Sequence, residues 1–266
     1  KDWYWDMSVN GYTYANKMLN LPDEYKVSGM PNGNQRIYEG KDIYRWEMRQ
    51  FAGLDEKGNS LWYMDRDLTD GEGNVVGVEK VTTGDATEAT QYLLEKSALP
   101  DFTGGLNTTL RWKSLDLTIM TNFQFGGYGY DYDFSAFSSA NFPMNRLKNY
   151  ADAWNPETGK GSAPIWNTND SNINASSDRF LISKTYFNLR NITLGYTFPA
   201  NWMSKIGIKS VRVYFACDNV FFASKRKGYD PRTSMGGQGA TVALNSVDGT
   251  YYSPIRTTSV GLNINF

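Results

Sequence analysis

The feature that most limits the fold of this chain is a regular alternation of side chains between residues 102 and 125. One face of the first half carries Phe102, Gly104, Leu106, Thr108, Leu110 and Trp112. After a turn near Lys113 and Ser114, the alternation resumes with Leu115, Leu117, Ile119, Thr121, Phe123 and Phe125. Because successive side chains of a strand point to opposite faces, this pattern predicts two long antiparallel strands joined by a short turn.

Five further segments alternate in a similar way, so the sequence predicts about seven strands. They cover residues 3–10, 41–53, 180–198, 209–222 and 257–266, and the second alternates less regularly than the others. A bulge is expected near Arg190 and Asn191, where the pattern changes register. The longest segments far exceed the roughly 5–6 residues common in soluble sheets, and a membrane crossing needs about 9–11.

The connections between these segments differ greatly in length. Those covering residues 54–98, 127–179 and 223–253 are long, whereas those after residues 113 and 198 are short. This alternation is typical of outer-membrane barrels, which have short periplasmic turns and longer extracellular loops. A short helix is expected over residues 145–154, ended by Asn155 and Pro156.

The composition excludes several classes of function. The chain has no histidine and one cysteine, which removes Ser-His-Asp and Cys-His catalysis, imidazole-bound zinc and internal disulfides. The net charge of -1 gives no basic surplus for nucleic acid. Aromatic residues make up 15% of the chain although its mean hydropathy is -0.53, which favours two-faced strands. We therefore expect a protein that is not an enzyme and carries no cofactor.

One segment, residues 186–199, reads YFNLRNITLGYTFP, and further distinctive motifs lie at residues 51–58, 100–106, 153–157, 218–221, 228–231 and 259–266. In this order, the motifs resemble those of SusC/RagA-type TonB-dependent outer-membrane transporters. The first segment is similar to the signature SYLRLKNITLGYTLP of that family, and Arg232 stands where the family usually has glutamate. The resemblance covers nearly the whole chain.

The resemblance implies a transmembrane antiparallel β-barrel segment with long extracellular loops, the last part of a 22-stranded plugged barrel. Residues 1–266 would be the C-terminal portion of this transporter, a multi-pass protein of the cell outer membrane of a Gram-negative bacterium. The plug and the earlier strands would lie outside this chain. The expected activity is TonB-dependent uptake of oligosaccharides or peptides together with a SusD-type surface lipoprotein, which acts as a lid. The partners would also include outer-membrane lipid and the TonB complex.

The alternation alone also fits a secreted, soluble β-sandwich that binds carbohydrate. The two folds differ in what covers the apolar face, which includes Leu106, Leu110, Leu117, Ile119, Val213 and Leu262. A second sheet would bury these side chains in a sandwich, whereas lipid would contact them in a barrel.

Candidate substrate-binding residues are aromatic side chains in the long loops: Tyr128, Tyr130, Tyr132, Trp154 and Trp166. Each has a structural alternative, since the tyrosines could pack the loop onto its neighbours and Trp154 could anchor a loop. Asp131 and Asp133 could hold a cation, but two acids in a loop are more often solvated, and we expect no metal.

Three other features have a functional and a structural interpretation. The basic run 225–227 could contact lipopolysaccharide phosphates or a partner, or be only solvated. Cys217 is expected to be a small lipid-facing hydrophobe. The resemblance implies that Phe266 belongs to a signal read by the barrel-assembly machinery, and the alternative is an aromatic girdle residue at the periplasmic interface.

Overall fold

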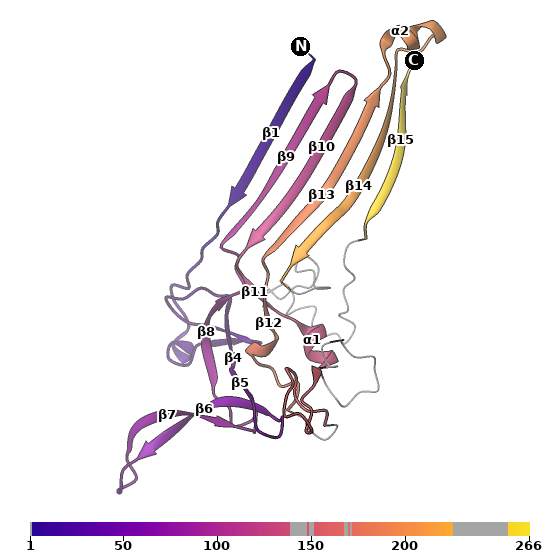
Figure 1. Ribbon diagram of the computed structural model, residues 1–266. Coiled ribbons are helices and arrows are strands. Elements are labelled where there is room, and N and C mark those ends of the chain that lie inside the picture. Colours follow the sequence, from indigo (N-terminus) through magenta and orange to yellow (C-terminus); the bar gives the residue numbers. More distant parts are fainter. Residues whose placement is uncertain (1, 139–147, 149–151, 168–169, 171, 226–254) are drawn as a thin grey trace.

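The computed structural model describes residues 2–138, 148, 152–167, 170, 172–225 and 255–266. Within these ranges, six long antiparallel strands lie side by side in one curved sheet, in the order β1-β9-β10-β13-β14-β15 (Figure 1). Their bounds are Trp3–Tyr12, Phe102–Trp112, Leu115–Phe125, Tyr186–Thr197, Ser210–Ser224 and Thr257–Asn265. The expected all-β fold class is confirmed. The sheet is open, with β1 and β15 at its two edges.

The strand register places like side chains in rows that cross the whole sheet. One row is Trp5, Leu110, Leu117, Leu194, Phe215 and Val260. The neighbouring row on the other face is Tyr4, Arg111, Asp116, Gly195, Tyr214 and Gly261. One face is therefore apolar and the other largely polar, as in a barrel with a lipid-facing exterior and a hydrated interior.

No layer of protein covers the apolar face in the described part of the chain. Leu194 is 47% exposed, Phe215 is 45% exposed and Val260 is 77% exposed. In a sandwich, a second sheet would pack on these side chains and bury them. The soluble sandwich interpretation therefore does not fit, and the face has the surface expected in lipid.

Aromatic side chains form two belts on the apolar face, one at each end of the sheet. Trp3 stacks on Trp112 and Tyr196 packs on Phe198 at the end with short turns. Phe102, Phe123 and Phe125 pack together at the end with long connections. The ten-residue step from Phe102 to Trp112 on β9 is about 34 Å along the strand, or roughly 26 Å along the normal at a barrel tilt of about 40°. The belts match the height of a bilayer apolar zone.

The bulge expected near Arg190 is confirmed. Thr121 of β10 pairs with Leu189 of β13, whereas Met120 pairs with Asn191, so Arg190 is the extra residue. The pairing of β13 with β14 shifts at the same place. The bulge keeps the apolar side chains on one face on both sides of the shift.

Residues 41–53 do not form a strand of the large sheet, contrary to the sequence prediction. They form β4 (Arg45–Arg49) and β5 (Phe51–Leu54), which belong to two small sheets. Trp46, Glu47 and Met48 are consecutive and all buried, so β4 is covered on both faces and lies inside protein. The large sheet accordingly has six strands where about seven were expected, and the connection from β1 to β9 spans residues 13–101.

The described parts of the connections 13–101 and 126–185 fold together into a loop domain at one end of the sheet, opposite both chain termini (Figure 1). Its strands are β2 (Met30–Asn32), β3 (Gln35–Ile37), β4, β5, β6 (Ser60–Thr69), β7 (Val75–Thr83), β8 (Gln91–Ser97), β11 (Tyr128–Tyr130) and β12 (Leu181–Ser183). Its helical turns are η1 (Asp23–Tyr25), α1 (Tyr132–Phe137) and η3 (Asp178–Phe180).

At the opposite end, α2 (Ala200–Met203) and η4 (Ser204–Ile206) connect β13 to β14. Among the described residues, no helix has the length and apolar character needed to cross a membrane. The helix expected over 145–154 lies mostly outside the described residues, and within them Ala153 forms a β-bridge with Ala163.

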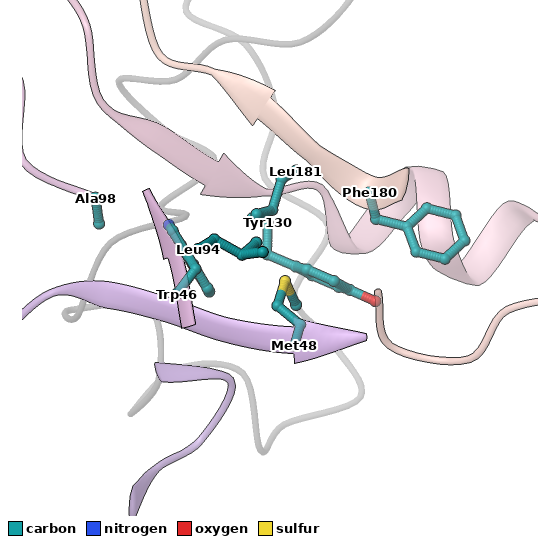
Figure 2. Packing of buried hydrophobic residues seen from close by; sticks show 7 residues of the cluster. All are labelled: Trp46, Met48, Leu94, Ala98, Tyr130, Phe180 and Leu181. Atoms are coloured by element: carbon teal, nitrogen blue, oxygen red, sulfur yellow. The ribbon is translucent and has the colours of Figure 1, made fainter. Parts of the chain in front are cut away.

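The loop domain has a hydrophobic core of its own. Figure 2 shows the buried side chains, which are Trp46, Met48, Leu94, Ala98, Tyr130, Phe180 and Leu181. They come from β4, β8, the β11–β12 pair and the turns beside them, so segments more than 100 residues apart meet there. The loop domain is thus a packed body that can hold side chains in fixed positions.

Candidate functional site

The loop domain is tied to the end of the sheet by hydrogen bonds around the start of β13. The Gln124 side chain of β10 donates to the carbonyl oxygen of Lys184 at 3.2 Å, and the backbone N–H of Asp101 donates to the carbonyl oxygen of Phe125 at 2.9 Å. Within the loop domain, the Lys184 ammonium group donates to the carbonyl oxygen of Ala98 at 3.2 Å. Burial lowers the pKa of Lys184. The position of the loop domain over the sheet is therefore fixed by direct contacts.

Tyr128, Tyr130 and Tyr132 follow one another along β11 and the start of α1, but their surroundings differ. Tyr130 is 4% exposed, lies in the core, packs edge-on against Tyr132 at 4.5 Å, and donates from its hydroxyl to Ser135 at 3.1 Å. Burial raises the pKa of Tyr130. Burial also raises the pKa of Tyr132, and the neighbouring Tyr130 raises it further. Tyr128 and Tyr132 are half-buried at the border of the core. The core thus orients the two more accessible rings.

Asp131 stabilises the helix that follows these tyrosines. Its carboxylate accepts a hydrogen bond from the backbone N–H of Phe134 at 2.9 Å, and the residue is 2% exposed. This is the N-cap position of α1, where an acidic side chain is favoured. Among the described residues, no group of acidic or cysteine side chains is arranged to hold a metal ion.

Trp154 packs on a glycine of another loop, far away in the sequence. Gly58 has a φ of +81°, and a Cβ placed on it would lie 2.5 Å from carbons of the Trp154 indole. The backbone N–H of Ile165 also donates to the carbonyl of Gly58 at 2.9 Å. The two family-like motifs at 51–58 and 153–157 therefore meet in space, with the indole lying over a position that only glycine can occupy.

An open hollow of about 670 Å³ lies where these two loops meet. It is lined by Leu54, Asp55, Glu56, Trp154, Gly159, Lys160 and Gly161. The lining combines one aromatic ring with carboxylates and an ammonium group, which together can stack on a ring and hydrogen-bond to hydroxyl or amide groups. Trp166, which is 45% exposed, directly follows Ile165, whose backbone N–H donates to Gly58.

The Asp55 carboxylate shapes one wall of this hollow. It accepts backbone hydrogen bonds from Lys57 at 2.8 Å and Asn59 at 2.7 Å, and a third bond from the Asn59 side chain at 2.8 Å. Partial burial raises the pKa of Asp55, but these hydrogen bonds outweigh burial and leave the pKa below its ordinary value. The carboxylate is therefore held ionised and closes the turn.

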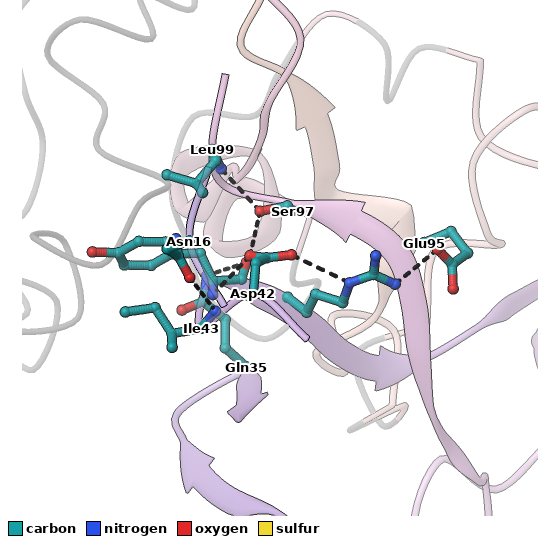
Figure 3. A network of polar contacts seen from close by, with 9 residues as sticks. Asn16, Gln35, Asp42, Ile43, Glu95, Ser97 and Leu99 are labelled. Atoms are coloured by element: carbon teal, nitrogen blue, oxygen red, sulfur yellow. Dashed lines mark hydrogen bonds and ion pairs between the residues drawn. The ribbon is translucent and has the colours of Figure 1, made fainter. Parts of the chain in front are cut away.

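A polar network also stiffens the loop domain (Figure 3). The Asp42 carboxylate accepts from the Ser97 hydroxyl at 2.8 Å and pairs with Arg45 at 3.2 Å, and Arg45 in turn pairs with Glu95 at 2.7 Å. The Asn16 side chain accepts from the backbone N–H of Ile43 at 2.9 Å. This network joins β4 and β8 to the segment that follows β1.

The polar face of the large sheet carries an ion pair that spans three strands. The Arg212 guanidinium of β14 contacts both carboxylate oxygens of Asp116 on β10 across Gly195 of β13, with Nε 3.0 Å from Oδ1. Any side chain at Gly195 would collide with this pair, and the Tyr214 ring lies over Gly261 in the same manner. The ion pair therefore lies on the polar face of the sheet and links β10 to β14 across β13.

Sequence reasoning missed the lining of the hollow other than Trp154. Asp55, Glu56 and Lys160 gave a weak signal, since the first two lie in the motif at 51–58 and the third follows the motif at 153–157.

The structure describes only Lys225 of the basic run 225–227, and this residue is exposed at the end of β14. Arg226, Lys227 and the motif at 228–231 lie outside the described residues. Cys217 lies on the apolar face, paired with Ile192 and Thr258.

The chain was compared with known proteins. No family model matches the sequence. TonB-dependent receptor P3 of Formosa agariphila is 24% identical over all of this chain, which covers 27% of that receptor. TonB-dependent receptor SusC of Bacteroides thetaiotaomicron is 24% identical over all of this chain, which covers 25% of that receptor. The chain thus spans about a quarter of the length of these curated relatives.

A comparison with solved structures shows that the fold of the whole chain occurs in a known transporter. The structure of the RagAB peptide transporter matches all of this chain with a TM-score of 0.76 at 24% identity, over 28% of the matched chain. The resemblance to the SusC/RagA type is confirmed. SusC/RagA-type receptors are outer-membrane β-barrels, so the expected outer-membrane location is confirmed as well. The curated relatives are TonB-dependent receptors rather than enzymes.

Proposed function

We propose that this chain is part of a TonB-dependent importer that takes oligosaccharides or peptides across the outer membrane. The observation that carries the proposal is the two-faced sheet, apolar and belted outside and polar inside, with a packed loop domain at one end. The names of relatives agree with it, since they include TonB-dependent receptors and a peptide transporter.

Residues 1–266 are, in this proposal, the C-terminal portion of a plugged barrel, and the plug and the earlier strands belong to the rest of the protein. The two open edges of the sheet support it. In lipid, an unpaired strand edge leaves N–H and C=O groups without partners at a cost of several kcal/mol each. Strands from the rest of the barrel must pair with β1 and β15 to remove that cost.

The loop domain is the part of this chain that meets the cargo and a SusD-type surface lipoprotein. Long connections lie on the extracellular side of such barrels, where cargo arrives. The hollow beside Trp154 offers a stacking ring and charged groups for cargo. Tyr128, Tyr132 and Trp166 add accessible aromatic surface elsewhere in the loop domain. Tyr130 acts by orienting its neighbours, because it is buried.

The proposal is tested with variants of exposed residues in the hollow. In the whole transporter with its lid, Glu56→Ala combined with Lys160→Ala removes polar lining without changing the Trp154 packing. We expect cargo to bind at least about fivefold more weakly, which corresponds to about 1 kcal/mol, and uptake to fall with it. Lys57→Ala is the matched control, since Lys57 is exposed beside the hollow and does not line it. Equal cargo binding by the double variant and the control would remove the hollow from the import route.

A further inference from the structure

A second hollow lies on the apolar face of the sheet, at the end that carries the loop domain. Its volume is about 230 Å³, and it is lined by Phe125, Thr185, Tyr186, Phe187, Ala223, Ser224 and Lys225. These residues come from the end of β10, the start of β13 and the end of β14. The hollow therefore crosses three neighbouring strands of the large sheet.

The register shows that the apolar members of this lining point away from the barrel interior. Phe187 pairs with Phe123 on one side and with Ala223 on the other, and all three share the face that carries the aromatic belts. Phe125 is 52% exposed and packs against Phe123 at 5.6 Å. The hollow opens toward the membrane, within the belt at the extracellular end.

Lys225 places a positive charge at the rim of this apolar hollow. It directly follows the last residue of β14 and is exposed. No carboxylate among the described residues pairs with it. An apolar hollow at the depth of acyl chains, with an ammonium group at the adjacent membrane surface, is complementary to a lipid that carries a phosphate.

We propose that this hollow is a binding site for a phosphorylated glycolipid of the outer leaflet. One acyl chain would lie against Phe125, Phe187 and Ala223, and a headgroup phosphate would contact the Lys225 ammonium group. The site is distinct from the hollow beside Trp154, because Phe125, Phe187 and Ala223 line it on the membrane-facing side of the sheet. The acyl chain and the phosphate follow from the two chemistries side by side, an apolar hollow for the chain and a cation for the phosphate. The place of the hollow at the extracellular end of the sheet assigns the lipid to the outer leaflet.

The test measures lipid retained by the whole transporter in detergent, using native mass spectrometry with diphosphorylated lipid A as the probe. Lys225→Gln removes the charge, and we expect it to retain about fivefold less lipid A, as for the loss of one basic contact at a membrane surface. Ala223→Trp fills the hollow and should reduce retention similarly. Lipid A without phosphates should bind wild-type protein as weakly as phosphorylated lipid A binds Lys225→Gln.

Two variants on the same strand serve as controls. Lys209→Gln removes an exposed lysine at the other end of β14, and Cys217→Trp enlarges a side chain on the same face outside the hollow. Both should retain lipid A like the wild type. Equal retention by wild type and Lys225→Gln, or equal retention of phosphatidylethanolamine and lipid A, would overturn the proposal. If Ala223→Trp does not assemble, the proposal is still tested by comparing two quantities: the retention of lipid A by Lys225→Gln and the retention of phosphate-free lipid A by the wild type.

Discussion

Gly58 and Gly73 occupy the same place in two successive turns of the loop domain. Each follows an aspartate by three residues and precedes an asparagine, and the Asp55 and Asp70 carboxylates accept the same set of hydrogen bonds. Both glycines have positive φ, at +81° and +87°. They differ in their surroundings, because Trp154 covers Gly58 whereas a Cβ placed on Gly73 would have no contact within 4 Å beyond its chain neighbours.

This pair of glycines allows a matched experiment. Alanine at either position costs about 1–2 kcal/mol through the left-handed backbone. Gly58→Ala should also displace the Trp154 indole, so we expect faster hydrogen exchange in residues 152–165 for this variant alone. Mass spectrometry of exchanged peptides measures the difference. Equal hydrogen-exchange rates in residues 152–165 for Gly58→Ala and Gly73→Ala would show that the contact with the indole does not stabilise this segment.

Asp55 gives the loop domain an acid-dependent element. Its pKa is lowered in the folded protein, so its stabilising contribution is complete above the unfolded value near 3.8 and is lost as the pH falls through the lower folded value. We expect the turn at residues 55–59 to open in that acidic range. Hydrogen exchange, corrected for the intrinsic effect of pH, measures this opening. Asp55→Asn should show no such acid transition in the turn, and an unchanged transition would assign it to another group.

At the scale of the strands, the two faces of β10 have different surroundings, one apolar and one polar. Ile119 lies on the apolar face between Thr108 and Ile192, whereas its neighbour Met120 lies on the polar face between Asn107 and Asn191. Both residues are near the middle of β10, and hence near the middle of the bilayer. The two positions therefore share depth and strand, and differ only in face.

Arginine at these two positions should separate the faces. Ile119→Arg puts a charge into lipid near the bilayer midplane and should destabilise the barrel by about 2–4 kcal/mol. Met120→Arg points into the hydrated interior and should cost far less. Unfolding of the reconstituted whole barrel by denaturant measures both. A loss of stability at Met120 as large as at Ile119 would contradict the assignment of the faces.

The strands that cross the membrane could be predicted from sequence because each has one face toward lipid, which produces strict alternation. The same rule was wrong for β4, where Trp46, Glu47 and Met48 are buried on both sides by the loop domain. The hollow beside Trp154 could not be predicted from spacing, because it forms where two turns about 100 residues apart meet. Likewise, whether Tyr130 packs or is accessible depends on Phe180, which is distant in sequence.

At the scale of the whole molecule, the two edges of the sheet determine where further strands must pair with this chain. β1 and β15 each have one neighbour in the described structure, and their side chains are almost entirely exposed. Phe266 follows β15 at the end with short turns and is 77% exposed. We expect the rest of the barrel to close on both edges during insertion into the membrane.

Phe266→Ala tests whether the last residue guides that insertion. If Phe266 is part of the assembly signal, the variant should reach the outer membrane in much smaller amounts, while the protein that does insert has nearly normal stability. Quantifying the whole transporter in outer-membrane fractions measures this. Normal amounts with a small loss of stability would instead make Phe266 an ordinary belt aromatic. Trp112→Ala, which alters a belt residue within β9, is the control.

The hairpin of β6 and β7 projects from the loop domain away from the rest of the molecule (Figure 1). At its tip, a side chain on Gly71 or Gly73 would meet no other atom within 4 Å. Exposed loop tips of this kind accept inserted sequence without loss of the fold. A short epitope placed between these glycines would stand outside the cell, where an antibody or dye can reach it, so that single transporters can be counted and followed on living bacteria.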